Sequence, residues 1–402
     1  MKILYLLTQD LESPTGTGRF FPLARELVRL GHQVSIAALH GNYQALENTH
    51  FTRDGVEIYY VGQMHVQKAG SLKRYFSPGR LILISAYATW ALTQAALRIP
   101  ADIVHVAKPH PMNSIAGLAA KYIRRRRLIL DCSDYEAGTN RFGGVWQRSI
   151  IAFFENSMPR LADHITTHAT FLRDRLLSLG VPREKIAYLP NGMDYERFGF
   201  VDEAELSTLR SSLGLLDKRV VAFIGTLTAH AHAVDLLMKA FQQVLQEIPE
   251  AVLLIVGGGE KYGQLQEYAQ ALGISAATVF CGRVPAAQVN CYYRLADVSV
   301  DPVYDNPVAR SRFPIKLFES WGAGIPFVTA DVGDRRSLLE QPPAGLLAKP
   351  GDAASLANVI LQVLKDPALA DEIRRNGYER ARSFDWKALA KEMEKVYLKL
   401  LP

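Results

Sequence analysis

The chain has 402 residues, of which 49% are hydrophobic and 21% charged, and its formal net charge is +6. This length exceeds that of a typical single domain, so we expect two globular domains of about 200 residues each. Three widely spaced cysteines, Cys132, Cys281 and Cys291, exclude a zinc-type spacing and an even-numbered disulfide framework, which suits the reducing cytoplasm. The first seven residues lack the apolar length and the cleavage site of a signal peptide, and we interpret them as a buried strand.

Short apolar strands alternate with helices through the first half of the chain, as in doubly wound parallel sheets. A helix is expected over residues 20–30, where it ends at Gly31. The expected strands cover residues 2–7, 33–38, 56–61, 103–106, 128–131, 164–167 and 186–189.

A glycine-containing loop, with Gly16, Thr17 and Gly18, joins the first strand to the first helix. A dinucleotide fingerprint requires a third glycine near position 21, where this chain has Phe21. The loop therefore disfavours a dehydrogenase, although it leaves phosphate binding open.

Basic residues are concentrated in the first half of the chain. Residues 1–200 hold 24 Lys and Arg against 16 Asp and Glu, whereas the remaining residues hold 22 against 24. The two densest groups are Lys121 with Arg124, Arg125, Arg126 and Arg127, and Lys68, Lys73, Arg74 and Arg80. The first half therefore faces an anionic partner, or these residues form a solvated charged surface.

The second basic group precedes an apolar run over residues 81–97, which is too short and too polar to span a bilayer. An amphipathic helix with a basic flank can lie on an anionic membrane surface, and a core helix is the alternative. Nucleic acid is not expected as a partner, because the basic residues are not interleaved with stacking aromatic residues.

The strand–helix alternation restarts after the segment Pro190-Asn-Gly-Met-Asp194. The second half is expected to contain strands over residues 220–224, 252–256, 278–280, 298–300, 326–329 and 345–347. The sequence thus predicts an α/β protein with two Rossmann-like halves and a ligand between them.

The segment from Ser311 to Pro326 reads as a loop that opens a short helix and then a strand. The start of a helix presents unpaired backbone N–H groups, and Arg310, Arg312 and Lys316 add three cations there. Glu319 follows within the same helix and could accept hydrogen bonds from two ribose hydroxyls. We interpret this segment as a nucleotide-diphosphate site, and an amphipathic helix with a surface glutamate is the alternative.

Several polar residues and glycines lie at or just after the ends of the expected strands, at the sheet edge where such folds bind ligands. They are His105, His110, Asp134, Glu136 and Arg141 in the first half, and Gly225, Thr226, Gly258 and Arg283 in the second. His168 and His230 have no partners at metal-ligand spacing, so no metal site is expected.

The ordered set of motifs resembles the GT-B-fold glycosyltransferases, specifically glycosyltransferase family 4, over nearly the whole chain. The motifs are Pro190-Asn-Gly-Met-Asp194, Ala296-Asp-Val298, Lys316-Leu-Phe-Glu319 with Gly324-Ile-Pro326, and Phe384-Asp-Trp386. The resemblance implies an acceptor-side Rossmann-like domain over 1–197, a donor domain over 198–385, and a final helix, 386–402, that packs back on the first domain.

The resemblance also implies retaining, metal-independent transfer of a hexose from a UDP- or GDP-sugar, without a further cofactor. We expect the acceptor to be a hydroxyl of a lipid-linked glycan, a polysaccharide or a small molecule. The cysteine usage and the basic and apolar segments predict a cytoplasmic protein with peripheral contact to the inner face of a membrane. The resemblance places His110 or His105 beside the donor sugar, and Asp134, at another strand end, is a candidate to meet the acceptor. Donor-binding positions would be Glu319, Lys316, Arg312, Arg310, Ser311, Phe313, Pro314, Thr226, His232, Gly225, Gly258, Arg283, Gly16, Thr17 and Gly18.

Three positions depart from the family pattern. Ser311 stands where many members carry the first of two glutamates, and Thr226 and His232 stand where they carry an Arg and a Lys that bind the diphosphate. Either Arg310, Arg312 and Lys316 take over the diphosphate, or the chain is a catalytically inactive partner subunit. A GT-B sugar-nucleotide epimerase is a further alternative.

Overall fold

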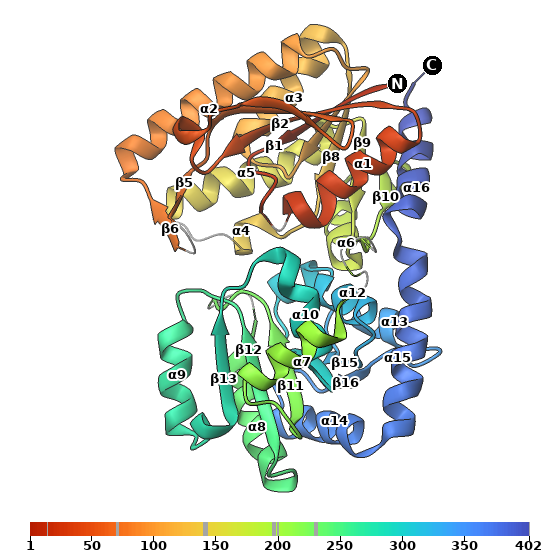
Figure 1. Cartoon of the computed structure of the whole chain (residues 1–402). Helices are drawn as coiled ribbons and strands as arrows, with labels where there is room; N and C mark the ends of the chain where they lie inside the picture. The colour runs from red at the N-terminus through yellow and green to blue at the C-terminus, as the bar shows by residue number, and fades with distance from the viewer. Residues whose placement is uncertain are drawn as a thin grey trace. The chain divides into compact units, whose positions relative to one another are not determined.

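The computed structural model describes residues 1–13, 15–69, 72–139, 144–194, 198, 201–228 and 232–401. These residues form two compact units, one of Met1–Gly192 with Trp386–Pro402 and one of Met193–Asp385 (Figure 1). The first unit thus ends at Gly192 rather than at residue 197. The reason is local, because the backbone N–H of Met193 donates to the carbonyl of Phe384 at 2.7 Å, within the second unit.

The first unit is built on an eight-stranded sheet in the order β10-β9-β8-β7-β1-β2-β4-β3, in which only β3 is antiparallel to its neighbour. The strands are β1 (Lys2–Leu7), β2 (Gln33–His40), β3 (His50–Arg53), β4 (Val56–Gln63), β7 (Ile103–Ala107), β8 (Arg127–Cys132), β9 (His164–Thr167) and β10 (Ile186–Tyr188). A separate antiparallel hairpin joins β5 (Val66–Ala69) and β6 (Leu72–Tyr75). The sequence analysis did not anticipate β3 or this hairpin, whose strands are only four residues long.

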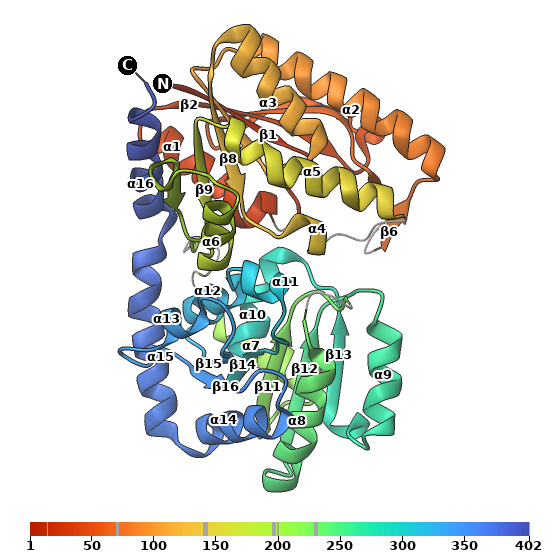
Figure 2. The ribbon, with the colours of Figure 1, turned by 180° about the vertical axis from the view of Figure 1, so that it is seen from behind.

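Helices cover both faces of this sheet. They are α1 (Phe21–Arg29), α2 (Pro78–Arg98), α3 (Pro111–Arg124), α4 (Glu136–Thr139), α5 (Val145–Leu161), α6 (Thr170–Ser178) and α16 (Trp386–Leu398). Because side chains alternate along a strand, Tyr5 of β1 joins a core with α1 and α16, whereas Leu4 and Leu6 join a core with α2, α3 and Met158 of α5. Figure 2 shows α2, α3 and α5 side by side on their face.

The last helix, α16, packs on the first unit, where the sequence analysis expects it. Its residues Trp386, Met393 and Tyr397 are buried with Phe20 and Leu27. The hydroxyls of Tyr397 and Tyr5 lie 2.7 Å apart in the core of the unit.

The second unit has a six-stranded parallel sheet in the order β13-β12-β11-β14-β15-β16. The strands are β11 (Arg219–Ile224), β12 (Ala251–Val256), β13 (Thr278–Gly282), β14 (Val298–Asp301), β15 (Phe327–Ala330) and β16 (Leu346–Ala348). The helices are α7 (Glu203–Ser212), α8 (Val234–Glu247), α9 (Tyr262–Ala271), α10 (Val289–Arg294), α11 (Pro307–Ser311), α12 (Ile315–Gly322), α13 (Arg335–Leu339), α14 (Ala353–Lys365) and α15 (Pro367–Ala381).

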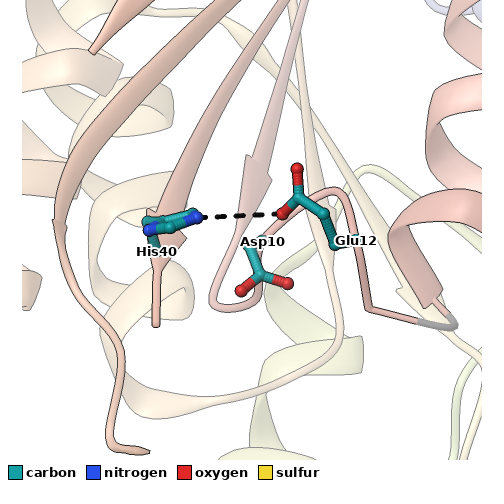
Figure 3. A group of neighbouring side chains, drawn as sticks. All are labelled: Asp10, Glu12 and His40. Atoms are coloured by element: carbon teal, nitrogen blue, oxygen red, sulfur yellow. Dashed lines mark ion pairs between the residues drawn. The ribbon is translucent and has the colours of Figure 1, made fainter. Parts of the chain in front are cut away.

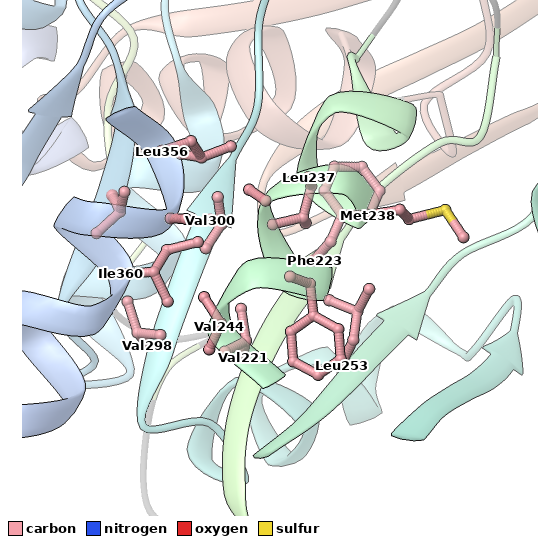
Figure 4. Packing of buried hydrophobic residues seen from close by; sticks show 14 of the residues in the cluster. Val221, Phe223, Leu237, Met238, Val244, Leu253, Val298, Val300, Leu356 and Ile360 are labelled. Atoms are coloured by element: carbon pink, nitrogen blue, oxygen red, sulfur yellow. The ribbon is translucent and has the colours of Figure 1, made fainter. Parts of the chain in front are cut away.

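Two apolar cores sandwich this second sheet. On one face Phe223 and Val221 of β11 pack with Leu237 and Val244 of α8 and with Ile360 of α14 (Figure 4). The opposite face packs against α12, whose Trp321 is fully buried.

Each sheet has one topological switch point, at a central strand whose two neighbours belong to successive parts of the chain that continue toward opposite edges of the sheet. In the first unit β1 pairs with β2 on one side and β7 on the other, and in the second β11 lies between β12 and β14. Ligands of open parallel sheets bind at such switch points, beyond the carboxyl ends of the strands. The fold therefore singles out the residues that follow β1 and β7, and those that follow β11 and β14.

None of the helices in the described ranges combines the length and apolarity needed to cross a bilayer.

Candidate functional site

A charged cluster lies at the switch point of the second unit. Asp301 is the last residue of β14, His232 follows β11, and Lys316 lies in the first turn of α12. The Nζ of Lys316 is 2.7 Å from Nε2 of His232, and Nδ1 of His232 is 3.0 Å from Oδ1 of Asp301. The three side chains are each at least 85% buried, so their charges interact with little screening.

Burial and the neighbouring charges fix the protonation of this cluster. Burial, together with the nearby Lys316 ammonium, lowers the pKa of His232 to about 4, so the imidazole is neutral near pH 7. Although burial alone would raise the pKa of Asp301, Lys316, His232 and Arg335 hold it well below its usual range. A neutral His232 that donates from Nδ1 to Asp301 leaves Nε2 free to accept a hydrogen bond from Lys316.

Two arginines add positive charge to the cluster. The Arg335 guanidinium, which is 3% exposed, lies 3.1 Å from Oδ2 of Asp301. The charge of Arg312 is close enough to lower the pKa of both His232 and Lys316. Burial is the main reason that the pKa of Lys316 is lowered, and a bound anion would favour the ammonium form.

Lys316 lies directly over Gly225, the residue after β11. A Cβ atom on Gly225 would come within 2.5 Å of Lys316 Cε and 2.8 Å of Nζ. Gly225 in turn packs closely on Gly257, since a Cβ on Gly257 would lie 1.8 Å from the Gly225 carbonyl oxygen. Gly257 also has a φ of +148°, which side-chain-bearing residues rarely adopt. These two glycines allow the lysine to reach its position.

Glu319 lies one helical turn beyond Lys316 on α12, so both side chains lie on the same side of the helix. The hydroxyl of Tyr293 donates to Oε2 of Glu319 at 3.0 Å and fixes the carboxylate. A carboxylate can accept several hydrogen bonds, so a ligand hydroxyl could also donate to Glu319.

The structure does not bring every expected donor-binding residue to this cluster. Arg310 makes a bidentate ion pair with Asp305, at 2.6 and 2.7 Å, on the surface. The hydroxyl of buried Ser311 donates to the carbonyl of Val308 at 2.8 Å, so it caps a turn of α11. Phe313 is a core residue, with its ring stacked on Phe318 at 5.5 Å.

The other expected positions lie around the cluster. Pro314 is the N-cap of α12, and Thr226 is exposed just after Gly225. The carbonyl of Gly258 accepts a hydrogen bond from the Leu227 N–H at 3.1 Å, and Arg283 is exposed next to Gly258.

A second polar cluster lies at the switch point of the first unit. His110, after β7, has Nδ1 3.2 Å from the Thr8 hydroxyl and Nε2 2.8 Å from Oε2 of Glu136. Lys108 Nζ lies 2.5 Å from Oδ2 of Asp134 and 3.0 Å from Oε1 of Glu136. The sequence-predicted residues His110 and Asp134 are therefore joined through Lys108 and Glu136.

Lys108 is held in an unusual backbone conformation, with a φ of +71°. A non-glycine residue in the left-handed region costs about 1 kcal/mol or more, and such residues concentrate at functional sites. Although burial lowers the pKa of Lys108, Asp134 and Glu136 more than offset it and raise the pKa above its ordinary value. The lysine is thus charged and fixed between two carboxylates.

His105, which the sequence analysis placed beside the donor sugar, is a core residue. It is fully buried in the middle of β7, where Nδ1 lies 2.8 Å from the Tyr397 hydroxyl and the ring stacks on Tyr5 at 4.9 Å. Burial lowers its pKa to about 4. The sequence does not separate the two histidines, because both lie near the carboxyl end of β7, but His105 is inside the fully buried strand and only His110 lies beyond it.

The loop after β1 is packed against its own backbone. The N–H groups of Gly16 and Thr17 are bonded to the side chain and carbonyl of Ser13, at 3.3 and 2.9 Å. A Cβ on Gly16 would lie 2.6 Å from the Asp10 carbonyl oxygen. Gly16, Thr17 and Gly18 form a π-helical turn, Gly16–Phe20, and the first two amides are engaged within the loop rather than directed at a phosphate.

Among the described residues, Asp10, Glu12 and His40 are close enough together to share a metal ion (Figure 3). Their other contacts do not suit one. Lys68 lies 2.7 Å from Asp10, and the Asn42 N–H donates to Nδ1 of His40. His40 therefore carries its proton on Nε2, which points toward Glu12 at 3.9 Å and offers no lone pair.

Sequence reasoning missed Asp301, Arg335 and Lys108. Asp301 could have been found, because it ends an apolar strand at the edge where ligands bind, whereas Arg335 carried no sequence signal. Two residues of the sequence analysis, Arg141 and His230, lie outside the described residues.

Comparison with known families matches each of the two units to a glycosyltransferase family model. A family model described as glycosyl transferases group 1 matches residues 207–380, and a glycosyl transferase 4-like domain model matches residues 16–192. An uncharacterized glycosyltransferase of Methanocaldococcus jannaschii is 26% identical over 393 residues, which cover 93% of this chain and 92% of that protein. A GDP-mannose-dependent alpha-(1-6)-phosphatidylinositol monomannoside mannosyltransferase of Mycolicibacterium smegmatis is 25% identical over 64% of this chain and 66% of its own.

Solved structures share the fold over the whole chain. HepE of Anabaena, crystallised with UDP, matches with a TM-score of 0.72 and 18% identity, over 100% of both chains. The glycosyltransferase WaaG matches with a TM-score of 0.70 and 16% identity, over 98% of this chain and 99% of its own. At these identities the matches establish the two-unit GT-B fold alone.

Proposed function

Because this chain belongs to the GT-B-fold glycosyltransferases of family 4 type, we propose that it transfers a hexose from a UDP- or GDP-sugar to a hydroxyl acceptor, with retention of configuration. The acceptor would be a lipid-linked glycan, a polysaccharide or a small molecule. UDP is supported by HepE of Anabaena, which was crystallised with UDP and with UDP-glucose, and GDP by the mannosyltransferase of M. smegmatis.

The observation that carries the proposal is the position of Lys316. Its ammonium is desolvated, lies at the switch point of the donor unit and is held by a neutral His232. Asp301 lies 3.6 Å from this ammonium and is shared with His232 and Arg335, so a nucleoside diphosphate would add a second anion beside Lys316, and Arg312 would add a second positive charge. Preorganised cations of this kind stabilise the charge that develops on a departing diphosphate.

Glu319 would accept hydrogen bonds from the ribose hydroxyls of the same nucleotide. Its carboxylate is oriented by Tyr293 and lies one turn from Lys316, so it can meet a ribose attached to a diphosphate at that lysine. We propose that Lys316 and Arg312 take the place of the Arg and Lys of the usual family pattern, and that transfer proceeds without a metal ion.

The first unit would carry the acceptor side of the reaction. His110 is fixed by Thr8 and Glu136, and we assign it to the region of the reacting sugar. In a retaining transfer on one face of the sugar, the leaving phosphate oxygen can accept the proton of the acceptor hydroxyl. Glu136, Lys108 and Asp134 would then hold His110 and one another in place and would not act as nucleophiles on the sugar.

Thermal-shift titration of the full chain against UDP, GDP, ADP and their sugar conjugates, with and without EDTA, tests the proposal. A ligand at about 100 times its dissociation constant adds about 2.7 kcal/mol to the free energy of unfolding, which raises the melting temperature measurably. We expect one nucleotide family to stabilise the protein, equally with EDTA, and the Glu319→Ala variant to lose the effect.

The matched control is Glu340→Ala, which removes an exposed carboxylate that pairs with Arg336 in the same unit. It should respond to the nucleotide as the parent protein does. The absence of any nucleotide response would contradict the proposal. Nucleotide binding without release of nucleoside diphosphate in the presence of acceptors would favour the inactive-subunit alternative, and a changed sugar nucleotide would favour the epimerase.

A further inference from the structure

Exposed apolar side chains gather on one helical layer of the first unit. Of the 18 large hydrophobic residues that are exposed in the described chain, 13 lie on β6, α2, α3 and α5. They include Leu83 at 72% exposure, Phe153 at 66% and Trp90 at 55%. We call the outer surface of β6, α2, α3 and α5 the docking face.

None of the first ten residues of α2 or of α5 is buried. The first ten residues of α2 include Leu81, Ile82, Leu83 and Ile84, yet the first buried residue of the helix is Ala88. In α5 the first buried residue is Glu155, ten residues after Val145. Both views of the ribbon place the starts of these two helices at the same end of the unit, beside β6 (Figures 1 and 2).

The same segments have a strongly one-sided charge. Between Ile58 and Leu130 the sequence has eleven Lys and Arg, and Asp102 is its single acidic residue. Lys68, Lys108 and Lys121 form ion pairs with aspartates, whereas Arg74, Arg80, Arg98, Arg124, Arg125 and Arg127 are exposed. On α5, Arg148 is exposed and the acidic residue Glu155 is buried. An ordinary solvated surface has both signs of charge interspersed, so this composition indicates an anionic partner.

The residue types of the docking face fit a lipid surface. Tyr75, Tyr87, Trp90 and Trp146 combine an apolar ring with a polar tip, and such side chains favour the headgroup region of a bilayer. Arginines next to apolar side chains can contact lipid phosphates while the apolar groups enter the acyl boundary. A second copy of the same face would bring like charges together, which disfavours a symmetric dimer.

We propose that the docking face binds the surface of membranes that contain anionic phospholipids, with the starts of α2 and α5 inserted at the headgroup level. The apolar side chains supply insertion and the arginines supply attraction to the phosphates. This proposal does not depend on the nucleotide site of the second unit.

The four tryptophans of the chain provide a built-in reporter. Trp90 and Trp146 lie on the docking face and are more than half exposed, whereas Trp321 and Trp386 are at most 1% exposed. Adding vesicles of phosphatidylcholine mixed with phosphatidylglycerol should shift the fluorescence to shorter wavelength and carry the protein into the floating vesicle fraction. Vesicles of phosphatidylcholine alone should do neither.

Two sets of variants separate the apolar and charged contributions. The pair Leu83→Ser and Phe153→Ser should abolish the fluorescence shift, and both residues are exposed enough to leave folding intact. Each arginine near the surface is worth about a fivefold change in affinity, so Arg74→Glu, Arg80→Glu and Arg148→Glu together should weaken binding by about a hundredfold or more. Leu216→Ser and Arg375→Glu, exposed in the second unit, are the matched controls and should bind vesicles as the parent does.

Circular dichroism and the melting temperature check that each variant is folded. Equal binding to neutral and anionic vesicles, or full binding by the folded variants, would overturn the proposal. Concentration-dependent association in sedimentation that Leu83→Ser removes, without vesicle binding, would instead assign the docking face to a second copy of the chain, and would also overturn it.

Discussion

The Nζ atom of Lys316 lies 2.7 Å from Nε2 of His232, although the two residues are 84 positions apart in the sequence. His232 is neutral, so it holds the lysine by a hydrogen bond without cancelling its charge. The carboxylate of Asp301, 3.6 Å from the same Nζ, is shared with His232 and Arg335. The lysine is therefore oriented but keeps its capacity to bind an anion.

Replacing Gly225 tests whether the position of Lys316 matters for activity. In Gly225→Ala the new Cβ would lie 2.5 Å from Lys316 Cε, so the side chain must move. Displacing a cation that stabilises the leaving group raises the activation free energy by roughly 3 kcal/mol, so we expect turnover to fall by about a hundredfold. Steady-state kinetics with the nucleotide sugar found by thermal shift would measure this change.

Gly263→Ala, in α9 of the same unit, is the matched control for Gly225→Ala. Its Cβ would meet no heavy atom within 4 Å, so turnover should change less than about twofold. Equal losses in the two variants would contradict the role of Lys316.

Removing the charge of Asp301 should destabilise the second unit. In Asp301→Asn the buried Arg335 and Lys316 lose their common carboxylate, which costs about 3–5 kcal/mol. Urea unfolding should show a lower midpoint. Asp331→Asn removes a partly exposed carboxylate that pairs with the exposed Arg336, so it should lower the midpoint much less. A midpoint for Asp301→Asn close to that of Asp331→Asn would refute the network.

Two buried histidines should make the fold sensitive to mild acid. The pKa of His105 and that of His232 are both lowered from 6.5 to about 4, chiefly by burial. The unfolded chain therefore binds protons before the folded one as the pH falls. Each histidine should subtract up to about 3 kcal/mol from the free energy of unfolding between pH 6.5 and pH 4, and nothing above about pH 7.5.

The His105→Gln variant checks this assignment. It keeps a polar partner for the Tyr397 hydroxyl but cannot take up a proton, so its free energy of unfolding should fall less steeply between pH 6.5 and 4.5. Denaturant titrations at several pH values would measure the slope. An unchanged slope would show that His105 is not responsible.

His110 should affect turnover but not donor binding. We expect His110→Gln to lower turnover by about a hundredfold or more, because positioned polar groups at the reacting sugar act on the transition state. The thermal shift with nucleotide should stay unchanged, since the nucleotide contacts lie in the second unit. His50→Gln, which removes an exposed histidine that pairs with Glu57, should change neither quantity.

Much of the fold could be predicted because each strand is a local apolar run. Every strand predicted from the sequence is present, with ends that differ by at most two residues, and the missing strands are the short β3, β5 and β6. The start of α12 with Lys316 and Glu319 was also readable, since helix starts and their charges are local features. The restart of the pattern after Pro190 likewise indicated two units.

The sequence by itself determined the alternation of strands and helices, the division into two Rossmann-like units and the placement of Lys316 and Glu319 on one helix. The tertiary structure alone decided which polar residues meet, because the order of strands in a parallel sheet is not written in their hydrophobic pattern. It brought Asp301 and His232 to Lys316 and moved Arg310 and Phe313 away from it. It also buried His105 and left His110 beyond the strand, since burial depends on the helices that cover the sheet, and α16 comes from the far end of the chain.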